Sequence, residues 1–405
     1  MRSAAATLLL ACGLLAGTGC KWLATPAWQD HQPRPAELPL VERTVPAPDV
    51  SAAGEPSAPP PSPGYYQLTA DECRDLACRN SAAANLIEAS VVVEPGCFAH
   101  LTGRDAVEYL RITAANHLSR EARNRTAAAA LTLYYRILEL ELKADVLANS
   151  VTEVDGLLKA AEVLEEKGFK PADDTHALKK QRVELTGEGA KLRSGLGKLN
   201  AELKSLLAID PGTPGLILPA DQVKVVPDPL DPQLAVQVGL ANRADLNLLR
   251  CVANAVDVRT LGPAKRVLTG LVPLLGAVSR PVEEPSVLSP FVDGLAKAEG
   301  SAVRRQLTGL LHDREREAAK DIRTAVDEWT TARDLVAVAR KKFELDTQRL
   351  DDLQKRSDTG QAVEADLRKA KLDLLKTEAD LIAAVTAWKI ADVKAREAMG
   401  LLCGP

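Results

Sequence analysis

The chain has 405 residues, a formal net charge of −4, 26% charged residues and only 3% aromatic residues. This composition is poor in aromatics for a compact enzyme, is typical of long exposed helices, and includes no basic, aromatic-rich stretch of the kind that binds nucleic acid. Beyond the N-terminal leader, no segment approaches the roughly 20 apolar residues that a membrane-spanning helix needs.

Residues 1–20 are predicted to be a lipoprotein-type signal peptide. An apolar run from Ala4 to Ala16 follows Arg2; it is too short to span a membrane and fits the core of an export signal. The run leads into the sequence Ala16-Gly17-Thr18-Gly19-Cys20. Small residues before a cysteine resemble a bacterial lipoprotein box, although Gly17 stands where leucine is usual, and Cys20 would then be acylated and held in a membrane. The alternative is ordinary secretory cleavage near the same small residues, with Cys20 a free thiol.

Residues 21–64 are predicted to form a proline-rich linker. Its prolines include Pro56, Pro59, Pro60, Pro61 and Pro63. Such a composition cannot bury a core and favours extended conformations. With an acylated Cys20, the linker would hold a folded body away from the outer membrane, on its periplasmic side. The alternative is a disordered tail without that role.

Residues 65–210 are expected to form a first helical repeat. The sequence predicts a short helix from Leu68 to Ala89, then a brief strand or extended link that begins at Val91. A long helical run should follow from about Gly103 to about Lys167. The repeat would therefore begin with small elements and continue into one long helix.

The first long helix is expected to turn back on itself between Gly168 and Asp174. Either Asp173 or Asp174 can cap the next helix, which should run from Thr175 to Leu207. Spacings that alternate between three and four give this helix an apolar seam: Leu178, Arg182, Leu185, Gly189, Leu192, Leu196, Leu199, Leu203 and Leu206. This period of 3.5 is typical of antiparallel helix pairs.

Residues 211–316 are expected to be a connector with short helices and a proline-rich segment. Residues 317–405 should form a second repeat, a coiled-coil hairpin that turns at Ser357 to Gln361 around Gly360. The outgoing seam is Val336, Ala339, Phe343, Asp346, Leu350 and Leu353. The returning seam is Leu367, Ala370, Leu374, Thr377, Leu381, Ala384, Trp388, Ala391, Ala395, Ala398 and Leu402. The polar seam residues Asp346, Thr377 and Arg182 are expected to pair across helices and fix register.

Five cysteines follow the leader: Cys73, Cys78, Cys97, Cys251 and Cys403. Export implies an oxidising compartment, in which disulfides are possible. Cys73 and Cys78 lie five residues apart on one expected helix and do not face each other well, so that pairing either of them with Cys97 is as plausible. The spacing is not that of a zinc site. An odd number of cysteines leaves at least one thiol unpaired or intermolecular.

The two halves repeat one pattern at an offset of roughly 190 residues. Between residues 128 and 402 the chain resembles the TolC family of outer-membrane efflux proteins. Leu206-Leu207-Ala208-Ile209-Asp210-Pro211 is similar to that family's Leu-Leu-Gly-Leu-Asp-Pro, and Asn242-Arg243-Ala244-Asp245-Leu246 to its Asn-Arg-Pro-Asp-Leu, with alanine for proline. Gln361 to Leu402 is similar to the last helix of the family, which closes on Glu397-Ala398-Met399-Gly400-Leu401.

This resemblance implies a mainly all-α fold of duplicated long antiparallel hairpins, as in a TolC-like α-barrel protomer; that this chain has few or no β-strands is expected from its departure from the family. It also implies a homotrimer that joins an inner-membrane pump through a periplasmic adaptor. The chain departs from the family where membrane β-hairpins belong. Only Val91 to His100 is available in the first half, and Leu261 to Gly300 in the second is interrupted by prolines, which do not fit inside central strands. We therefore expect these β-hairpins to be reduced or absent.

The first hypothesis is a TolC-like outer-membrane efflux or secretion component, a passive conduit in a multi-subunit export system. No nucleotide-binding loop is present to drive transport. The residues expected to contact a partner lie at the hairpin turns: Gly168, Asp173, Asp174, Asp358, Gly360 and Gln361. The alternative for these residues is that they form solvated turns.

The second hypothesis is a lipid-anchored helical scaffold of the cell envelope without a channel, which the missing strands favour. An enzyme is not expected, since the five histidines are scattered and no hydrolase, zinc-protease or dinucleotide motif occurs. No catalytic residue, cofactor or metal ligand is therefore assigned, and the acidic residues are read as solvated helix faces and partners of Lys and Arg.

Overall fold

The computed structural model describes residues 40–41, 64–89, 104–168, 174–210, 212–221, 230–257, 260–262, 264–265, 290–359 and 364–403. The predicted signal peptide with Cys20, and most of the predicted linker, lie outside these residues.

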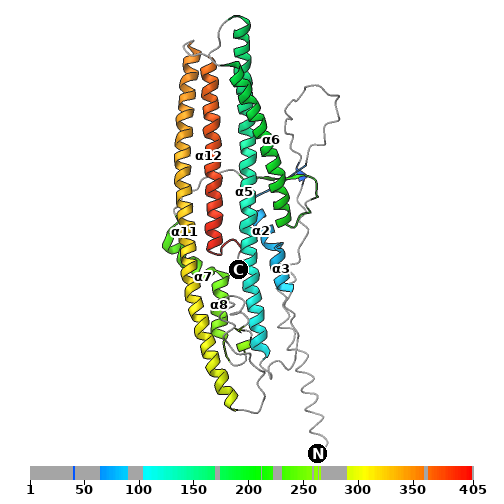
Figure 1. Cartoon of the computed structure of the whole chain (residues 1–405), viewed down its shortest axis with the longest axis vertical. Helices are drawn as coiled ribbons and strands as arrows, with labels where there is room; N and C mark the ends of the chain where they lie inside the picture. Colours follow the sequence, from blue (N-terminus) through cyan, green and yellow to red (C-terminus); the bar gives the residue numbers. More distant parts are fainter. Residues whose placement is uncertain are drawn as a thin grey trace, which may run out of the picture.

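Four long helices form two antiparallel hairpins (Figure 1). They are α5 (Arg104–Glu166) and α6 (Thr175–Leu206) in the first hairpin, and α11 (Pro290–Asp358) and α12 (Glu364–Ala398) in the second. α6 packs on α5, α5 on α12 and α12 on α11, so that the hairpins lie side by side with α6 and α11 at the two edges. Both hairpins turn at the same end of the molecule. The predicted mainly helical fold with duplicated hairpins is confirmed.

The first hairpin begins and ends where the sequence predicts. α5 has 63 residues, which corresponds to a length of about 95 Å. Gly168 follows it with a φ of +75°, a left-handed conformation that glycine adopts without strain. Asp174 is the N-cap of α6, and its carboxylate accepts a hydrogen bond from the backbone N–H of His176 at 3.0 Å. Such a cap contributes about 1 kcal/mol to helix stability.

The predicted seam of the second hairpin is buried at about half of its positions and partly buried at the others. Its buried members are Val336, Ala339, Leu367, Ala370, Thr377, Trp388, Ala391, Ala395 and Leu402. Trp388 packs against Trp329 of α11, with ring centroids 6.1 Å apart, in a buried cluster that both helices share. The prediction that Thr377 pairs across helices is wrong. Its hydroxyl donates to the carbonyl of Leu374 in the same helix, since a buried threonine can form a hydrogen bond with the backbone of the preceding turn.

The start of the first repeat differs from the predicted single helix. It consists of strand β2 (Tyr65–Leu68) and helices α2 (Ala70–Arg79) and α3 (Ala82–Ala89). The Thr69 side chain accepts from the N–H of Glu72, while the Glu72 carboxylate accepts from the N–H of Thr69. This reciprocal capping box starts α2 one residue after the strand ends.

A small sheet joins the two ends of the first repeat. β2 pairs antiparallel with β1 (Leu40–Val41), which lies within the predicted linker, and parallel with β3 (Leu216–Pro219). The outer edge of β3 presents no free N–H group. The N–H of Ile217 donates to the Asn200 side chain at 2.6 Å, and Pro219 has no N–H. The described edge is thus closed to pairing with another strand.

Two short helices, α7 (Pro232–Asn242) and α8 (Ala244–Ala255), follow the sheet in the predicted connector. α7 packs on α11, and α8 packs on both α5 and α11. The outgoing helix of the second hairpin starts at Pro290, earlier than the predicted boundary at residue 317. Residues 91–100 and most of 261–289, where we expect reduced β-hairpins, lie outside the described residues. No helix in the described part of the chain is long and apolar enough to cross a membrane.

Candidate functional site: the paired hairpin tips

The structure places three of the six predicted contact residues at the shared end of the hairpins. Gly168 follows α5, Asp174 caps α6, and Asp358 is the last residue of α11. The other three, Asp173, Gly360 and Gln361, lie outside the described residues. The described tip residues therefore come from both hairpins and lie at one end of the molecule (Figure 1).

An ion-pair cluster that the sequence analysis did not foresee joins the two hairpins near their tips. The guanidinium of Arg368 on α12 contacts the Glu153 carboxylate on α5 at 3.1 Å, and Lys371 contacts the same carboxylate at 3.5 Å. Arg368 also binds Glu364 one turn back at 2.8 Å. The Glu153 side chain is only 18% exposed, so that the central pair is partly shielded from solvent.

Gly156 makes the approach of Arg368 possible. A Cβ atom built at Gly156 would lie 2.1 Å from Nη1 of Arg368, so the guanidinium occupies the space that a side chain would fill. A glycine inside a helix costs about 1 kcal/mol relative to alanine, and this close contact is the physical reason for it here. An interior helical glycine next to charged residues is the only sequence signal that could have indicated the cluster.

The remaining charged contacts near the tips are more exposed. Within the first hairpin, Arg182 of α6 contacts Asp155 of α5 at 2.6 Å, which confirms the prediction that Arg182 pairs across helices. In the second hairpin, Arg349 contacts Asp373 at 3.0 Å. Exposed ion pairs of this kind contribute about 0–1 kcal/mol each. The tips are therefore joined by contacts that are individually weak.

A small apolar cluster lies beneath these charges. It is formed by the buried residues Leu157, Ala161 and Leu178, with Leu158, Ala365 and Leu372 partly buried against them. The members come from α5, α6 and α12, so that both hairpins contribute. Within the described residues no group of His, Cys, Asp and Glu is arranged to hold a metal ion. The tips therefore combine mixed charges with an apolar cluster that both hairpins share.

At the opposite end of α12, the Asn-Arg-Ala-Asp-Leu segment forms the joint between α7 and α8. Arg243 donates two hydrogen bonds to Asp245, at 3.0 and 2.8 Å, and a third at 3.5 Å to the carbonyl of Ala398 on α12. Burial raises the pKa of Asp245, but the hydrogen bonds and charge of Arg243 outweigh it, so that the pKa lies below its ordinary value. Gly400 has a φ of +71°, and a Cβ atom built there would lie 3.3 Å from the Cα of Arg243, so the end of α12 packs closely on this joint.

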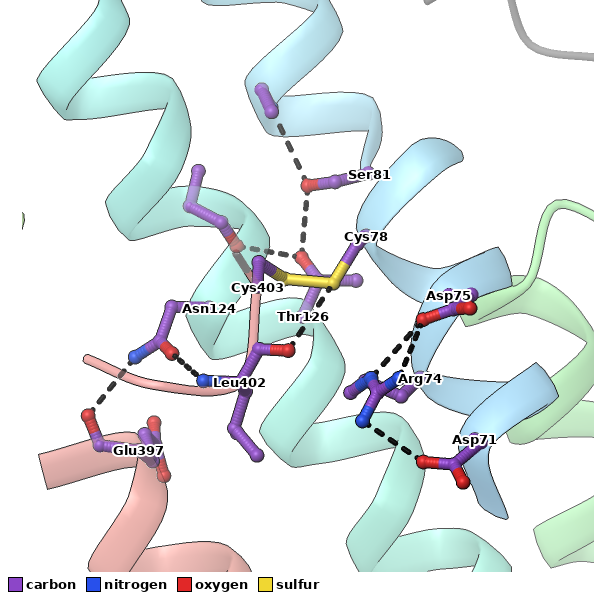
Figure 2. The surroundings of a disulfide bond; sticks show 12 residues. Asp71, Arg74, Asp75, Cys78, Ser81, Asn124, Thr126, Glu397, Leu402 and Cys403 are labelled. Carbon is purple, nitrogen blue, oxygen red and sulfur yellow. Dashed lines mark hydrogen bonds and ion pairs between the residues drawn. A yellow bond between two sulfur atoms is a disulfide. The ribbon is translucent and has the colours of Figure 1, made fainter. Parts of the chain in front are cut away.

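A disulfide joins Cys78 on α2 to Cys403 beyond the end of α12 (Figure 2). The sequence leaves a pairing of Cys73 or Cys78 with Cys97 open, and for Cys78 the structure replaces it with the bond to Cys403. The two sulfurs are 325 residues apart in sequence, and only the return of α12 to α2 brings them together. Cys73 and Cys251 are free thiols, whereas Cys97 lies outside the described residues.

Comparison with known proteins gives matches among solved structures alone. No protein-family model matches the chain. No curated protein matches it either. The outer-membrane channel OprN is similar with a TM-score of 0.53 and 14% identity over 82% of this chain and 89% of that one. CusC, described as forming a transmembrane channel, has a TM-score of 0.52 and 14% identity over 75% of this chain and 74% of its own. The outer membrane protein VceC from Vibrio cholerae has a TM-score of 0.50 and 13% identity over 82% and 93%.

The chain has the fold of TolC-family outer-membrane channels. In this chain the Asn242-Arg243-Ala244-Asp245-Leu246 segment has a physical role: Arg243 and Asp245 fix the joint on which the end of α12 rests. Because the identities are below 15%, the likeness establishes the TolC-like arrangement of the helices alone.

Proposed function

We propose that this protein is a subunit of a TolC-like efflux or secretion conduit at the outer membrane, anchored by acylated Cys20 and assembled as a homotrimer. It would act passively, and its hairpin tips would meet a periplasmic adaptor of an inner-membrane pump. The observation that carries the proposal is the open layer of four helices, whose two outer edges, α6 and α11, carry complementary surfaces.

The exposed edge of α6 carries a stripe of mostly small side chains, here called the α6 stripe. Its members are Val183, Gly187, Ala190, Ser194, Gly197 and Ala201, all of them exposed. They repeat at spacings of three and four and lie on the side turned away from the seam that packs on α5. A Cβ built at Gly187 or Gly197 would meet nothing within 4 Å. Nothing within the described chain accounts for these two helix-weakening glycines, whereas close approach of another helix would.

The exposed edge of α11 carries large apolar side chains at matching spacing. Leu335, Val338 and Leu345 are 58%, 60% and 52% exposed and lie on one face, away from the contact with α12. Large side chains on one helix pack into the spaces that small residues leave on another. The edge formed by these three residues, the α11 stripe, fits the α6 stripe of a second copy.

A contact between the α6 stripe of one copy and the α11 stripe of the next is head-to-tail. Contacts of this kind close into a ring when the rotation between copies divides a full turn. A ring of such four-helix layers encloses a helical tube, which is the geometry that a conduit requires. The resemblance to TolC implies three copies.

The remaining features support the location and the partner. A disulfide between Cys78 and Cys403 requires an oxidising compartment such as the periplasm. The hairpin tips combine mixed charges with the exposed apolar residues Val163 and Leu164, which are 46% and 40% exposed. Such a surface suits docking of another helical protein, for which a periplasmic adaptor is the candidate.

The proposal is tested by purifying the full-length protein in detergent and measuring its mass by light scattering and its conductance in planar lipid bilayers. A stable trimer with discrete single-channel steps is the expected result. A monomer that produces no conductance would overturn the conduit.

The second candidate, an envelope scaffold without a channel, is favoured by the two segments available for membrane β-hairpins, since the first is short and the second is interrupted by prolines. It predicts an oligomer that associates through the same stripes but leaves bilayers without conductance. Radiolabelled palmitate incorporation, compared between the wild type and Cys20→Ala, tests the anchor independently of either function.

A further inference from the structure

Residues just beyond the ends of both returning helices are bonded to the same short helix, α2. The side chain of Asn80, the C-cap residue of α2, donates to the carbonyl of Leu207 at the end of α6, at 2.8 Å. Two residues earlier, Cys78 is bonded to Cys403 at the end of α12. α2 thus connects the bases of the two hairpins, through a hydrogen bond on one side and a covalent bond on the other.

The base of α12 is held by a second residue that is buried. Asn124 on α5 is 3% exposed; its amide donates to the carbonyl of Glu397 at 3.0 Å, and its oxygen accepts from the N–H of Leu402 at 3.1 Å (Figure 2). Leu402 and Cys403 are themselves 5% exposed and belong to the same apolar cluster as Cys73. The polypeptide after α12 is therefore packed into the core.

We propose that the Cys78–Cys403 disulfide is a redox-dependent clasp that fixes the base of α12 to α2, so that reduction frees the last turn of α12 while the hairpin tips stay paired. The clasp depends only on the packing of the described residues, so that it does not require the protein to be a conduit. The oxidation state of this cystine would then control whether the base of α12 can move.

The chemistry of release requires a dithiol or two monothiols. A thiolate of the reductant attacks Sγ of the half-exposed Cys78, forms a mixed disulfide, and expels Cys403 as a thiolate that takes up a proton. A second thiol then attacks the mixed disulfide and frees Cys78. The reductant ends as a disulfide, and the cystine has gained two electrons and two protons.

The neighbouring thiol does not interfere with the clasp. Cys73 lies on the same helix but is fully buried, and burial, with a smaller contribution from the charge of Asp221, raises its pKa to about 12. A thiol in this state does not form the thiolate that disulfide exchange requires at neutral pH. Cys73 is thus kept from exchanging with the nearby cystine, and an external reductant is needed.

The test is hydrogen–deuterium exchange of the full-length protein, before and after reduction with a dithiol, with the disulfide-linked peptides identified by mass spectrometry beforehand. Amides of residues 393–402 are expected to exchange about a hundredfold faster after reduction, the factor that a typical native disulfide supports. Amides of residues 364–375, near the tips, should change little. The double variant Cys78→Ser/Cys403→Ser should reproduce the reduced pattern without reductant, and Cys251→Ser is the matched control that should not.

Two results would overturn the proposal. Unchanged exchange at residues 393–402 after verified reduction would mean that Asn124 and the core hold the base without the disulfide. An equal acceleration along all of α12 would mean that the cystine stabilises the whole fold and controls no particular end.

Discussion

At the scale of single residues, Arg243 and Asp245 decide how α12 ends. Their ion pair is partly buried, at 2.8 Å, and Arg243 also reaches the carbonyl of Ala398. A carboxylate with a lowered pKa stabilises the fold at every pH above its unfolded pKa of about 3.9, and this contribution is lost as the pH falls through the lower folded value. Glu397 acts in the opposite sense, because burial, aided by the charge of Glu121, raises its pKa.

Replacing Asp245 by asparagine should therefore remove part of the acid sensitivity of the fold. We expect Asp245→Asn to lower the free energy of unfolding by about 1–3 kcal/mol at pH 7, because it leaves Arg243 buried without its counter-charge. The difference from the wild type should shrink below pH 4. Urea unfolding followed by circular dichroism between pH 3 and pH 7 measures it. A difference that stays constant with pH would mean that the charge of Asp245 is unimportant. The same measurement on Glu397→Gln isolates the contribution of Glu397, whose pKa is shifted in the opposite direction.

The contact of Arg368 with Glu153 is a second residue-scale feature that can be isolated. A double-mutant cycle of Arg368→Ala and Glu153→Ala should give a coupling energy of about 1 kcal/mol, more than most exposed pairs because both groups are partly buried. Gly156→Ala should abolish this coupling while leaving both charges in place, since its methyl group would displace the guanidinium. Thermal unfolding of the single and double variants supplies the energies. A coupling energy near zero in both the wild type and the Gly156→Ala background would refute the assigned geometry.

At the scale of elements, the helices were predictable and their connections were not. A seam that repeats every 3.5 residues is a local property, so the bounds of α6 and α12 follow closely from the positions of apolar residues and of Asp174. The sheet of β1, β2 and β3 depends on pairing between segments about 150 residues apart in β2 and β3, and the Cys78–Cys403 bond depends on the return of α12. Neither leaves a local pattern in the sequence.

The α6 stripe yields the element-scale prediction. Gly187→Leu and Gly197→Leu should leave the single chain folded, because both positions face open space and leucine favours a helix by up to about 1 kcal/mol over glycine. Assembly should be lost, since the new side chains keep a neighbouring helix away. Light scattering in detergent should change from the mass of an oligomer to that of a monomer, while helical circular dichroism is retained.

The matched control for this experiment is Glu188→Leu, which adds the same side chain to the exposed charged face of α6 beside the stripe. It should leave the oligomeric mass unchanged. If Glu188→Leu and the two glycine variants behave alike, the α6 stripe is not the surface between copies.

At the scale of the whole molecule, the two ends of the hairpin layer are held by bonds of different kinds. The base contains a disulfide, the buried side chain of Asn124 and the Arg243–Asp245 joint. The tips contain largely exposed ion pairs above a small apolar cluster. We therefore expect a force applied along the molecule to separate the tips before the base, which is the order that the proposed conduit would need if it opened at its tips.

The cystine between Cys78 and Cys403 also makes the polypeptide a covalent ring of several hundred residues, with both hairpin turns inside it. A protease that cuts one turn opens this ring without dividing the protein, and the pieces remain one molecule until a thiol reduces the bond. A cut at either turn, which would release a helix from a chain without the cystine, can thus leave the packed layer in place.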